Sequence, residues 1–467
     1  MLLALTDMIS ELTTIESLFL SFRDGTKKPY DVVRKYLEKI ETHNAYYSAY
    51  QSVWVEEALA GAELATKALA AGHDLGPLHG VPFALKDIFH VTDKVTTCGT
   101  VELNQNVAKV TATVVRRLIN AGAIILGKTK TVECAFGGWG TNQMTGTPRN
   151  PWDDDVHRIP GGSSSGSAVA VASDLAVCAV GSDTGGSIRL PAGYCGLVGL
   201  KLTYGRLPND GIMPLSQSLD SPGPLTRSVC DALLMFEVMD GREGWKISQD
   251  YTDGTNNFSS LTRGVVGLRI GTLSASERQH CSAETLDAYD EAVLRLSRAG
   301  AVIQTFDNPK PYGELADTNG AITAVEAYYN HHQLYEDLNK KMDADVRARM
   351  LSGKQYTAHE YCGMREQRIQ DMTAFAAQMR GFDVLITPTT IGIAPDVDDV
   401  DQNIGPSYYT RPFNYLEMCG ISVPTGLDNQ GLPTSVQIVG RANDEYTILQ
   451  AGATLETMFG RLGIIGS

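Results

Sequence analysis

Apolar residues recur at helical spacing early in the chain. Val33, Tyr36 and Ile40 fall on one face of a helix that follows Pro29, because residues three or four apart share a face at 3.6 residues per turn. A proline suits the first turn of a helix, where its missing amide has no partner to lose. Helical segments are also predicted further along the chain, at residues 55–71 and 323–378.

A helix, the tripeptide Ala-Gly-Ala and a short apolar run follow one another at two places. In the first, residues 112–120 have helical spacing and 123–126 resemble a buried strand. In the second, Ser282 is a suitable N-cap for a helix that ends before a strand at 301–303. Two such units favour a sheet with substantial parallel content and helices packed on its faces. Two more strands are predicted at residues 80–85 and 382–388.

Residues 160–226 are rich in glycine, serine and proline, a composition that is typical of a flexible linker. Strongly apolar runs interrupt this segment, for example at 175–180 and 196–200. A linker cannot bury such runs, so we predict that the segment is folded core. We interpret the chain as a single α/β domain, residues 1–467, with three parts: a helical N-terminal part (about 1–72), a core (about 76–230) and a helix-rich C-terminal part (about 275–467).

Composition narrows the class of partner. Asp and Glu number 54 against 39 Lys and Arg, a net charge of −15, and no basic run offers a site for a phosphate backbone. No apolar stretch approaches the roughly 18 residues of a membrane-spanning helix, and the N-terminus lacks the basic start of a secretory leader. The eight cysteines are scattered without metal-ligand spacing. We therefore expect a cytoplasmic protein that binds no metal, nucleic acid or membrane.

Two turns rich in glycine and serine, 161–167 and 181–189, concentrate the candidate chemistry. Consecutive amides in such turns can hold an anion, but neither turn carries the Lys and Ser/Thr that complete a phosphate-binding loop. Residues 162–166 match Gly-x-Ser-x-Gly, which would make Ser164 a nucleophile served by a histidine. The downstream histidines lie in predicted helices, which disfavours this arrangement but leaves it open.

Lys86 follows the apolar run 81–85, so we expect it at the end of a buried strand. An amine that is stripped of water has a lowered pKa and can act as a general base for a serine. The alternative is a buried ion pair, with Asp87 as the first candidate partner. The spacing Ser-x-x-Lys does not occur, so a serine served by Lys86 would come from a distant segment.

Six longer motifs stand at residues 76–87, 161–168, 181–192, 195–201, 383–389 and 431–440. Together they resemble the amidase signature family. The resemblance covers most of the chain and implies the family's fold, a large mixed and partly parallel β-sheet with helices on both faces. It also implies an enzyme that works without metal or organic cofactor.

By this resemblance, the catalytic triad consists of Ser187, Ser163 and Lys86. Ser187 would attack the carbonyl carbon, and Ser163, which follows a cis peptide bond in the family, would pass the proton to neutral Lys86. Water would then hydrolyse the acyl-enzyme. The resemblance also implies an oxyanion hole that consists of the backbone amides of Thr184, Gly185, Gly186 and Ser187.

Residues 133–139 correspond to a segment that approaches the active site in this family. Phe136 and Trp139 are candidates for the wall of an acyl pocket, with core packing as the alternative, and Gly137 and Ser164 complete the expected pocket. Cys134 stands where an aromatic residue is frequent, which would widen the pocket. A structural role is favoured for the remaining polar candidates, namely Asp183, Arg189, Glu326, His331, Tyr408, Tyr409 and Asn414.

Three functions are compatible with these motifs. The first is an amidohydrolase that cleaves the C–N bond of a small amide, anilide, carbamate or urea. The second is the catalytic A subunit of a glutamyl-tRNA amidotransferase, which works with partner proteins. The third is a binding protein on the same scaffold, although all three catalytic positions are occupied here. We expect the first, acting on a small amide-type substrate, and homodimerisation is an expectation from the family alone.

Overall fold

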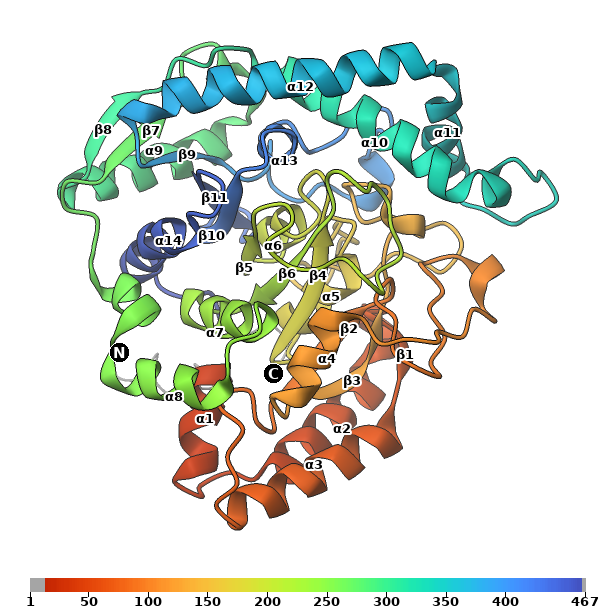
Figure 1. Ribbon diagram of the computed structural model, residues 1–467, viewed down its shortest axis with the longest axis vertical. Helices are drawn as coiled ribbons and strands as arrows, with labels where there is room; N and C mark the ends of the chain where they lie inside the picture. Colours follow the sequence, from red (N-terminus) through yellow and green to blue (C-terminus); the bar gives the residue numbers. More distant parts are fainter. Residues whose placement is uncertain (1–12, 464–467) are drawn as a thin grey trace.

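The computed structural model describes residues 13–463, and an 11-stranded mixed sheet runs through this part of the chain (Figure 1). The strand order is β1-β3-β2-β4-β6-β5-β10-β11-β9-β7-β8. The strands are β1 (Tyr50–Val53), β2 (Pro82–Lys86), β3 (Ile124–Thr129), β4 (Cys178–Asp183), β5 (Val198–Lys201), β6 (Ser221–Thr226), β7 (Arg269–Thr272), β8 (Val302–Thr305), β9 (Val384–Pro388), β10 (Cys419–Leu427) and β11 (Pro433–Gly440).

The strand pairing confirms the prediction of a partly parallel sheet. β2 is parallel to both β3 and β4, and β7 is parallel to both β8 and β9. The other neighbours are antiparallel. The strands of the two predicted helix-to-strand units, β3 and β8, both belong to parallel pairs. β8 forms one edge of the sheet and is largely exposed, whereas β3 is almost fully buried.

Helices cover both faces of the central strands, as the fold class required. β2, β4, β5, β6, β9 and β11 have no exposed position, which is possible only when both faces are covered. α5 packs on β2, β4 and β6 and contacts α6. α7 packs on β5 and β6, α14 on β10 and β11, and α9 on β9 and β11, while α4 packs on α7. These helices are α4 (Thr113–Asn120), α5 (Ser165–Ala172), α6 (Arg189–Tyr194), α7 (Val229–Met239), α9 (Ala283–Arg298) and α14 (Glu445–Phe459).

Helices also close the two ends of the molecule. α2 and α3 lie at one end, and α10, α11 and α12 lie together at the opposite end, beyond α13 (Figure 1). α2 begins at Pro29, as predicted. None of the helices in residues 13–463 is long and apolar enough to cross a membrane. The remaining helices are α1 (Ile15–Arg23), α2 (Pro29–Tyr47), α3 (Val55–Ala70), α8 (Gly244–Asp253), α10 (Tyr312–Tyr335), α11 (Ala344–Ser352), α12 (Ala358–Gln378) and α13 (Arg411–Tyr415).

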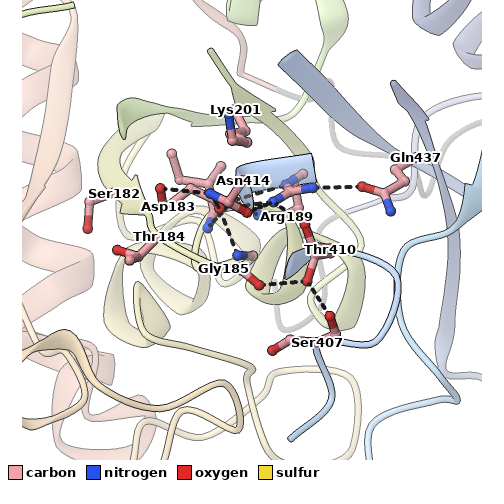
Figure 2. A network of polar contacts seen from close by, with 12 residues as sticks. Ser182, Asp183, Thr184, Gly185, Arg189, Lys201, Ser407, Thr410, Asn414 and Gln437 are labelled. Carbon is pink, nitrogen blue, oxygen red and sulfur yellow. Dashed lines mark hydrogen bonds and ion pairs between the residues drawn. The ribbon is translucent and has the colours of Figure 1, made fainter. Parts of the chain in front are cut away.

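A buried ion pair joins β4, α6, α13 and β11 (Figure 2). The Arg189 guanidinium donates to both carboxylate oxygens of Asp183, at 3.1 Å from Nε and 3.0 Å from Nη2. It also donates to Gln437 Oε1 at 3.0 Å, while Asn414 accepts from Arg189 and donates to Asp183. Neither Asp183 nor Arg189 is exposed to solvent. These contacts agree with the structural role that the sequence favoured for Asp183, Arg189 and Asn414.

The ion pair also fixes the protonation of Asp183. Burial by itself would raise the pKa of this carboxyl, but the charge and hydrogen bonds of Arg189 hold it well below its usual range. The group thus stabilises the fold at every pH above its unfolded pKa of about 3.9, and the contribution is lost as the pH falls through the lower folded pKa.

We predict that Asp183→Asn lowers the free energy of unfolding by about 3 kcal/mol or more at pH 7, because the change leaves Arg189 buried without an opposite charge. Urea unfolding followed by circular dichroism measures the loss. The difference from the unchanged protein should shrink below about pH 4, where Asp183 begins to be protonated in the unfolded chain.

A matched control is Asp290→Asn, which removes the partner of Arg278 in a pair that is 35% and 52% exposed. Water already solvates this pair, so the expected loss is less than about 1 kcal/mol. Equal losses for the two variants would contradict the role of the buried pair.

Candidate active site

Lys86 ends β2, an interior strand, and its side chain is fully buried. Its Nζ atom lies 2.8 Å from Ser163 Oγ and 2.8 Å from Ser182 Oγ and donates to both hydroxyls. The apolar run before Lys86 explains this position, because it places β2 between β3 and β4 in the covered part of the sheet. The structure therefore brings together two of the three residues of the expected triad, which are 77 positions apart.

Asp87 is not the partner of Lys86. Its carboxylate pairs with Lys128 at 3.1 Å, and the Thr97 amide donates to it at 3.1 Å. The buried ion pair that the sequence left open thus exists, but with a lysine from β3. Lys86 has only hydroxyl partners among the described residues, so burial lowers the pKa of its amine to about 7, although the charges of more distant acids partly oppose this. An amine with this pKa is substantially neutral at physiological pH.

The first glycine- and serine-rich turn places Ser163 beside Lys86. The Gly162–Ser163 peptide bond is cis, as the resemblance implies. The Ser163 carbonyl accepts hydrogen bonds from Thr131 Oγ1 at 2.9 Å and from the Val132 amide at 3.2 Å. A Cβ on Gly162 would lie 2.7 Å from the Gly137 carbonyl oxygen, so only glycine fits this close approach of two chain segments.

The second turn links β4 to α6 and carries Ser187. The Ser164 amide donates to the Ser187 carbonyl at 3.3 Å, so the two turns lie side by side. Gly186 has a φ of +127°, and a Cβ there would collide with Thr410 Oγ1, so the position requires glycine. Ser187 is 8% exposed, and its hydroxyl makes no hydrogen bond with any residue of the described range.

One expected member of the oxyanion hole is corrected by the hydrogen bonds of this turn. The Gly186 amide donates to Asp183 Oδ1 at 2.7 Å and is therefore already engaged. Thr184, Gly185 and Ser187 line a cavity, whereas Gly186 does not. The Asp183 carboxylate thus holds the turn through the Gly186 amide, which is not available to an oxyanion. The pattern of glycines in the sequence does not show which amide is used in this way.

The cavity beside Ser187 has a volume of about 400 Å³. Phe136, Gly137 and Trp139 line it, together with Asn319 of α10. The Phe136 and Trp139 side chains are largely buried in the remainder of the protein, so each contributes an edge to the cavity while packing in the core. The two interpretations of these aromatic residues, pocket wall and core packing, are thus compatible.

Ser164 does not line this cavity, contrary to the expectation. It is fully buried, and its hydroxyl donates to the Ser182 carbonyl at 3.3 Å and accepts from the Ser182 amide at 3.4 Å. The residue sits just before α5, where the chain turns into the core, and its side chain connects the two turns. This position also removes Ser164 from the role of an accessible nucleophile.

Four other polar candidates make contacts inside the scaffold and do not line the cavity. Glu326 accepts from Ser218 Oγ at 2.7 Å, and His331 Nε2 lies 2.7 Å from the Pro214 carbonyl oxygen. Tyr408 and Tyr409 both donate to Glu277, at 2.8 and 2.7 Å. These contacts agree with the structural role that the sequence favoured.

The sequence did not single out several residues of the cavity. Arg349 comes from α11 and Arg411 from the start of α13, more than 150 positions after Ser187. Gln402, Asn403 and Ser407 come from the loop before α13. No local pattern marks these residues, because their approach to Ser187 depends on how the C-terminal helices cover the turns.

Comparison with known proteins identifies the family of this chain. The family model described as Amidase matches residues 31–449. The A subunit of glutamyl-tRNA(Gln) amidotransferase from Geobacter metallireducens is 33% identical over 91% of this chain and 93% of its own length. 2-amino-5-chloromuconic acid deaminase from Comamonas testosteroni is 34% identical over 84% of each chain.

The fold is also that of a solved amidase. The X-ray structure of peptide amidase from Stenotrophomonas maltophilia superposes with a TM-score of 0.82 over 98% of this chain and 99% of its own, at 27% identity. The match therefore extends over the whole sheet and the helices around it. The protein that carries these two turns and this buried lysine belongs to the amidase family, the family whose signature its sequence resembles.

Proposed function

We propose that the protein is an amidohydrolase that cleaves the C–N bond of a small amide or of a related carbamate or urea through Ser187, Ser163 and Lys86. The observation that carries this proposal is the fully buried Lys86 amine, 2.8 Å from the Ser163 hydroxyl and without a carboxylate partner. The accessible hydroxyl of Ser187 in the neighbouring turn supplies the nucleophile. Membership of the amidase family supports the reaction class.

The proposed reaction moves one proton along these three residues. Ser187 Oγ attacks the carbonyl carbon while its proton passes to Ser163 Oγ, and the Ser163 proton passes to neutral Lys86. The tetrahedral intermediate collapses, the C–N bond breaks, and the proton returns through Ser163 to the leaving nitrogen. Water then attacks the acyl-enzyme by the same relay and releases the acid and Ser187.

Three backbone amides are available for the developing negative charge. Thr184, Gly185 and Ser187 border the cavity, and no acceptor in the described residues engages their amides. A donor that points at an oxyanion from a rigid turn contributes about 3 kcal/mol to transition-state stabilisation. The Asp183–Arg189 pair holds this turn in place, so the amides need no reorganisation during the reaction.

We predict that Ser187→Ala lowers kcat/KM for p-nitroanilide, primary amide or aryl carbamate substrates by about four orders of magnitude, because it removes the nucleophile. Initial rates measure the loss, and the mass spectrum of acid-quenched enzyme should lose the added acyl mass.

Ser164→Ala is the matched control, because Ser164 lies in the neighbouring turn and contacts only backbone groups. Its kcat/KM should stay within about tenfold of the unchanged enzyme, the effect of one neutral hydrogen bond. If Ser164→Ala abolished acylation and Ser187→Ala did not, the assignment of the nucleophile would be wrong.

The pH dependence of the reaction follows from Lys86. The relay requires the neutral amine, and the neutral fraction increases as the pH rises through the pKa of about 7. We predict that kcat/KM increases from acid pH with a midpoint near 7 and reaches a plateau above about pH 8. Rates with a p-nitroanilide over pH 5 to 10 measure this profile.

The residual activity of Lys86→Met should lack this midpoint. Thermal unfolding of the variant establishes that the loss of the buried amine has not unfolded the protein. A midpoint near 10, or an unchanged profile in Lys86→Met, would show that Lys86 is not the proton acceptor.

The second candidate is an amidotransferase A subunit, and the sequence relatives that bear this name favour it. Such a subunit would use the same residues on glutamine and pass ammonia to a partner protein. Co-expression with candidate partner subunits distinguishes the two functions. Turnover of amides by the purified chain alone favours the hydrolase, whereas glutamine hydrolysis that needs partner subunits favours the amidotransferase.

A further inference from the structure

The charged side chains that line the cavity beside Ser187 are all positive. Of the described residues that line it, only Arg349 and Arg411 are charged, and none is Asp or Glu. The protein as a whole has a net charge of −15, so these two guanidinium groups form a positive site within a negative molecule. Charge of one sign in a recessed site attracts ligands of the opposite sign.

Arg411 reaches the cavity without a partner of its own. Its aliphatic stem packs on Gly185, where a Cβ would lie 2.9 Å from Arg411 Cγ. Its guanidinium lies over Gly320 of α10, where a Cβ would lie 3.2 Å from Nη1. None of the described residues accepts a hydrogen bond from this guanidinium or forms an ion pair with it, so its donors are available to a ligand.

Arg349 is held in place by neutral groups. Its Nε donates to the Phe136 carbonyl at 3.0 Å, and its Nη1 donates to Gln402 Oε1 at 3.4 Å. Asp343, which caps α11, and Asp345 in its first turn accept hydrogen bonds from Gln143 and form no ion pair with Arg349 within the described residues. These two acids act on Arg349 only through their charges, so its remaining donors have no carboxylate in contact and can bind a ligand.

This arrangement differs from that of other arginines in the protein. Buried Arg189, Arg227 and Arg368 each face a carboxylate, in Asp183, Asp174 and Glu417 respectively. At Arg411, burial lowers the pKa and the charge of Arg349 lowers it further, with a smaller opposing effect from Asp317. A guanidinium stays protonated in spite of such shifts. The two charges thus repel one another until an anion binds between or beside them.

We propose that this cavity binds a carboxylate, so that the substrate of the proposed amidohydrolase is a small anionic amide, such as the monoamide of a short dicarboxylic acid. The Arg411 stem packs on Gly185, in the same turn as Ser187. A carboxylate bound there therefore belongs to the substrate whose amide reaches that serine. A planar guanidinium binds a carboxylate through two parallel hydrogen bonds. This inference rests on the proposed function for the identity of the reacting bond, but not for the binding of the anion.

Binding to the Ser187→Ala protein tests the inference without turnover. Isothermal titration calorimetry compares succinamate and glutaramate with the neutral diamides succinamide and glutaramide, and with inorganic phosphate. We expect at least one monoamide to bind about tenfold or more tightly than its diamide, because a charge-assisted hydrogen bond is stronger than a neutral one. Added salt should weaken the binding of the monoamide more than that of the diamide.

Variants at the two arginines complete the test. Arg411→Gln and Arg349→Gln, each combined with Ser187→Ala, should reduce the affinity for the preferred monoamide about tenfold or more and leave the diamide unaffected. The matched control is Arg34→Gln on α2, where Arg34 pairs with Glu38 at the surface. This control should bind as the parent does.

Equal affinity for monoamides and diamides would overturn the inference, as would unchanged binding in Arg411→Gln. Arginine-dependent binding of phosphate without binding of the monoamides would overturn the carboxylate in favour of another anion. Steady-state kinetics of the unchanged enzyme separate the two proposals. Hydrolysis that depends on Ser187 but prefers neutral amides contradicts the anionic substrate alone, whereas arginine-dependent binding without any hydrolysis contradicts the amidohydrolase alone.

Discussion

The chemistry proposed for this protein depends on an amine that is buried without a negative partner. A lysine in such a place is normally either paired or absent, because burial of an isolated ammonium is unfavourable. Here the neighbouring Asp87 is neutralised by Lys128, so the acid nearest in sequence does not stabilise the charged form of Lys86. The two hydrogen-bond partners of the amine, the hydroxyls of Ser163 and Ser182, are uncharged and do not stabilise the ammonium form as a carboxylate would. A lysine is thereby made available as a proton acceptor near neutral pH.

The position of this amine has consequences for the rest of the fold. Lys86 loses its water only because β2 lies between two parallel neighbours and because helices cover both faces of the sheet. The two serines proposed to act with Lys86, Ser163 and Ser187, lie in turns at the ends of other elements. Each turn is fixed by a glycine and by hydrogen bonds to its carbonyls or amides. The Asp183–Arg189 pair performs this task for the turn of Ser187 and links it to β11 and α13. The positions of Lys86 and of the two turns thus depend on the packing of the core around them.

The sequence predicted the parts of the structure that depend on local patterns. The two helix-to-strand units around residues 121–123 and 299–301 predicted parallel pairing, and the apolar run before Lys86 predicted its burial. The direction of single donors was not predictable. Gly185 and Gly186 look alike in sequence, but the Gly186 amide donates to Asp183, whereas Gly185 lines the cavity. The arginines of the cavity were missed for a different reason. Arg349 lies in a helix with several charged residues, and only the way this helix covers the turn of Ser187 distinguishes it.

The residues proposed to move protons and those proposed to select a ligand lie in different parts of the chain, which helps to explain how one fold serves several reactions. The residues proposed to move protons lie within positions 86–187, at strand ends and in turns that the core holds rigid. The charged residues that select a ligand lie on α11 and α13, which reach the cavity from the C-terminal part of the chain. A substitution at Arg349 or Arg411 alters the charge of the cavity without contact with Lys86, so the preferred substrate can change while the proton relay is kept. A hydrolase and an amidotransferase subunit with the same relay are therefore expected to differ in these covering segments and in the surfaces that meet a partner, and to agree in the two turns.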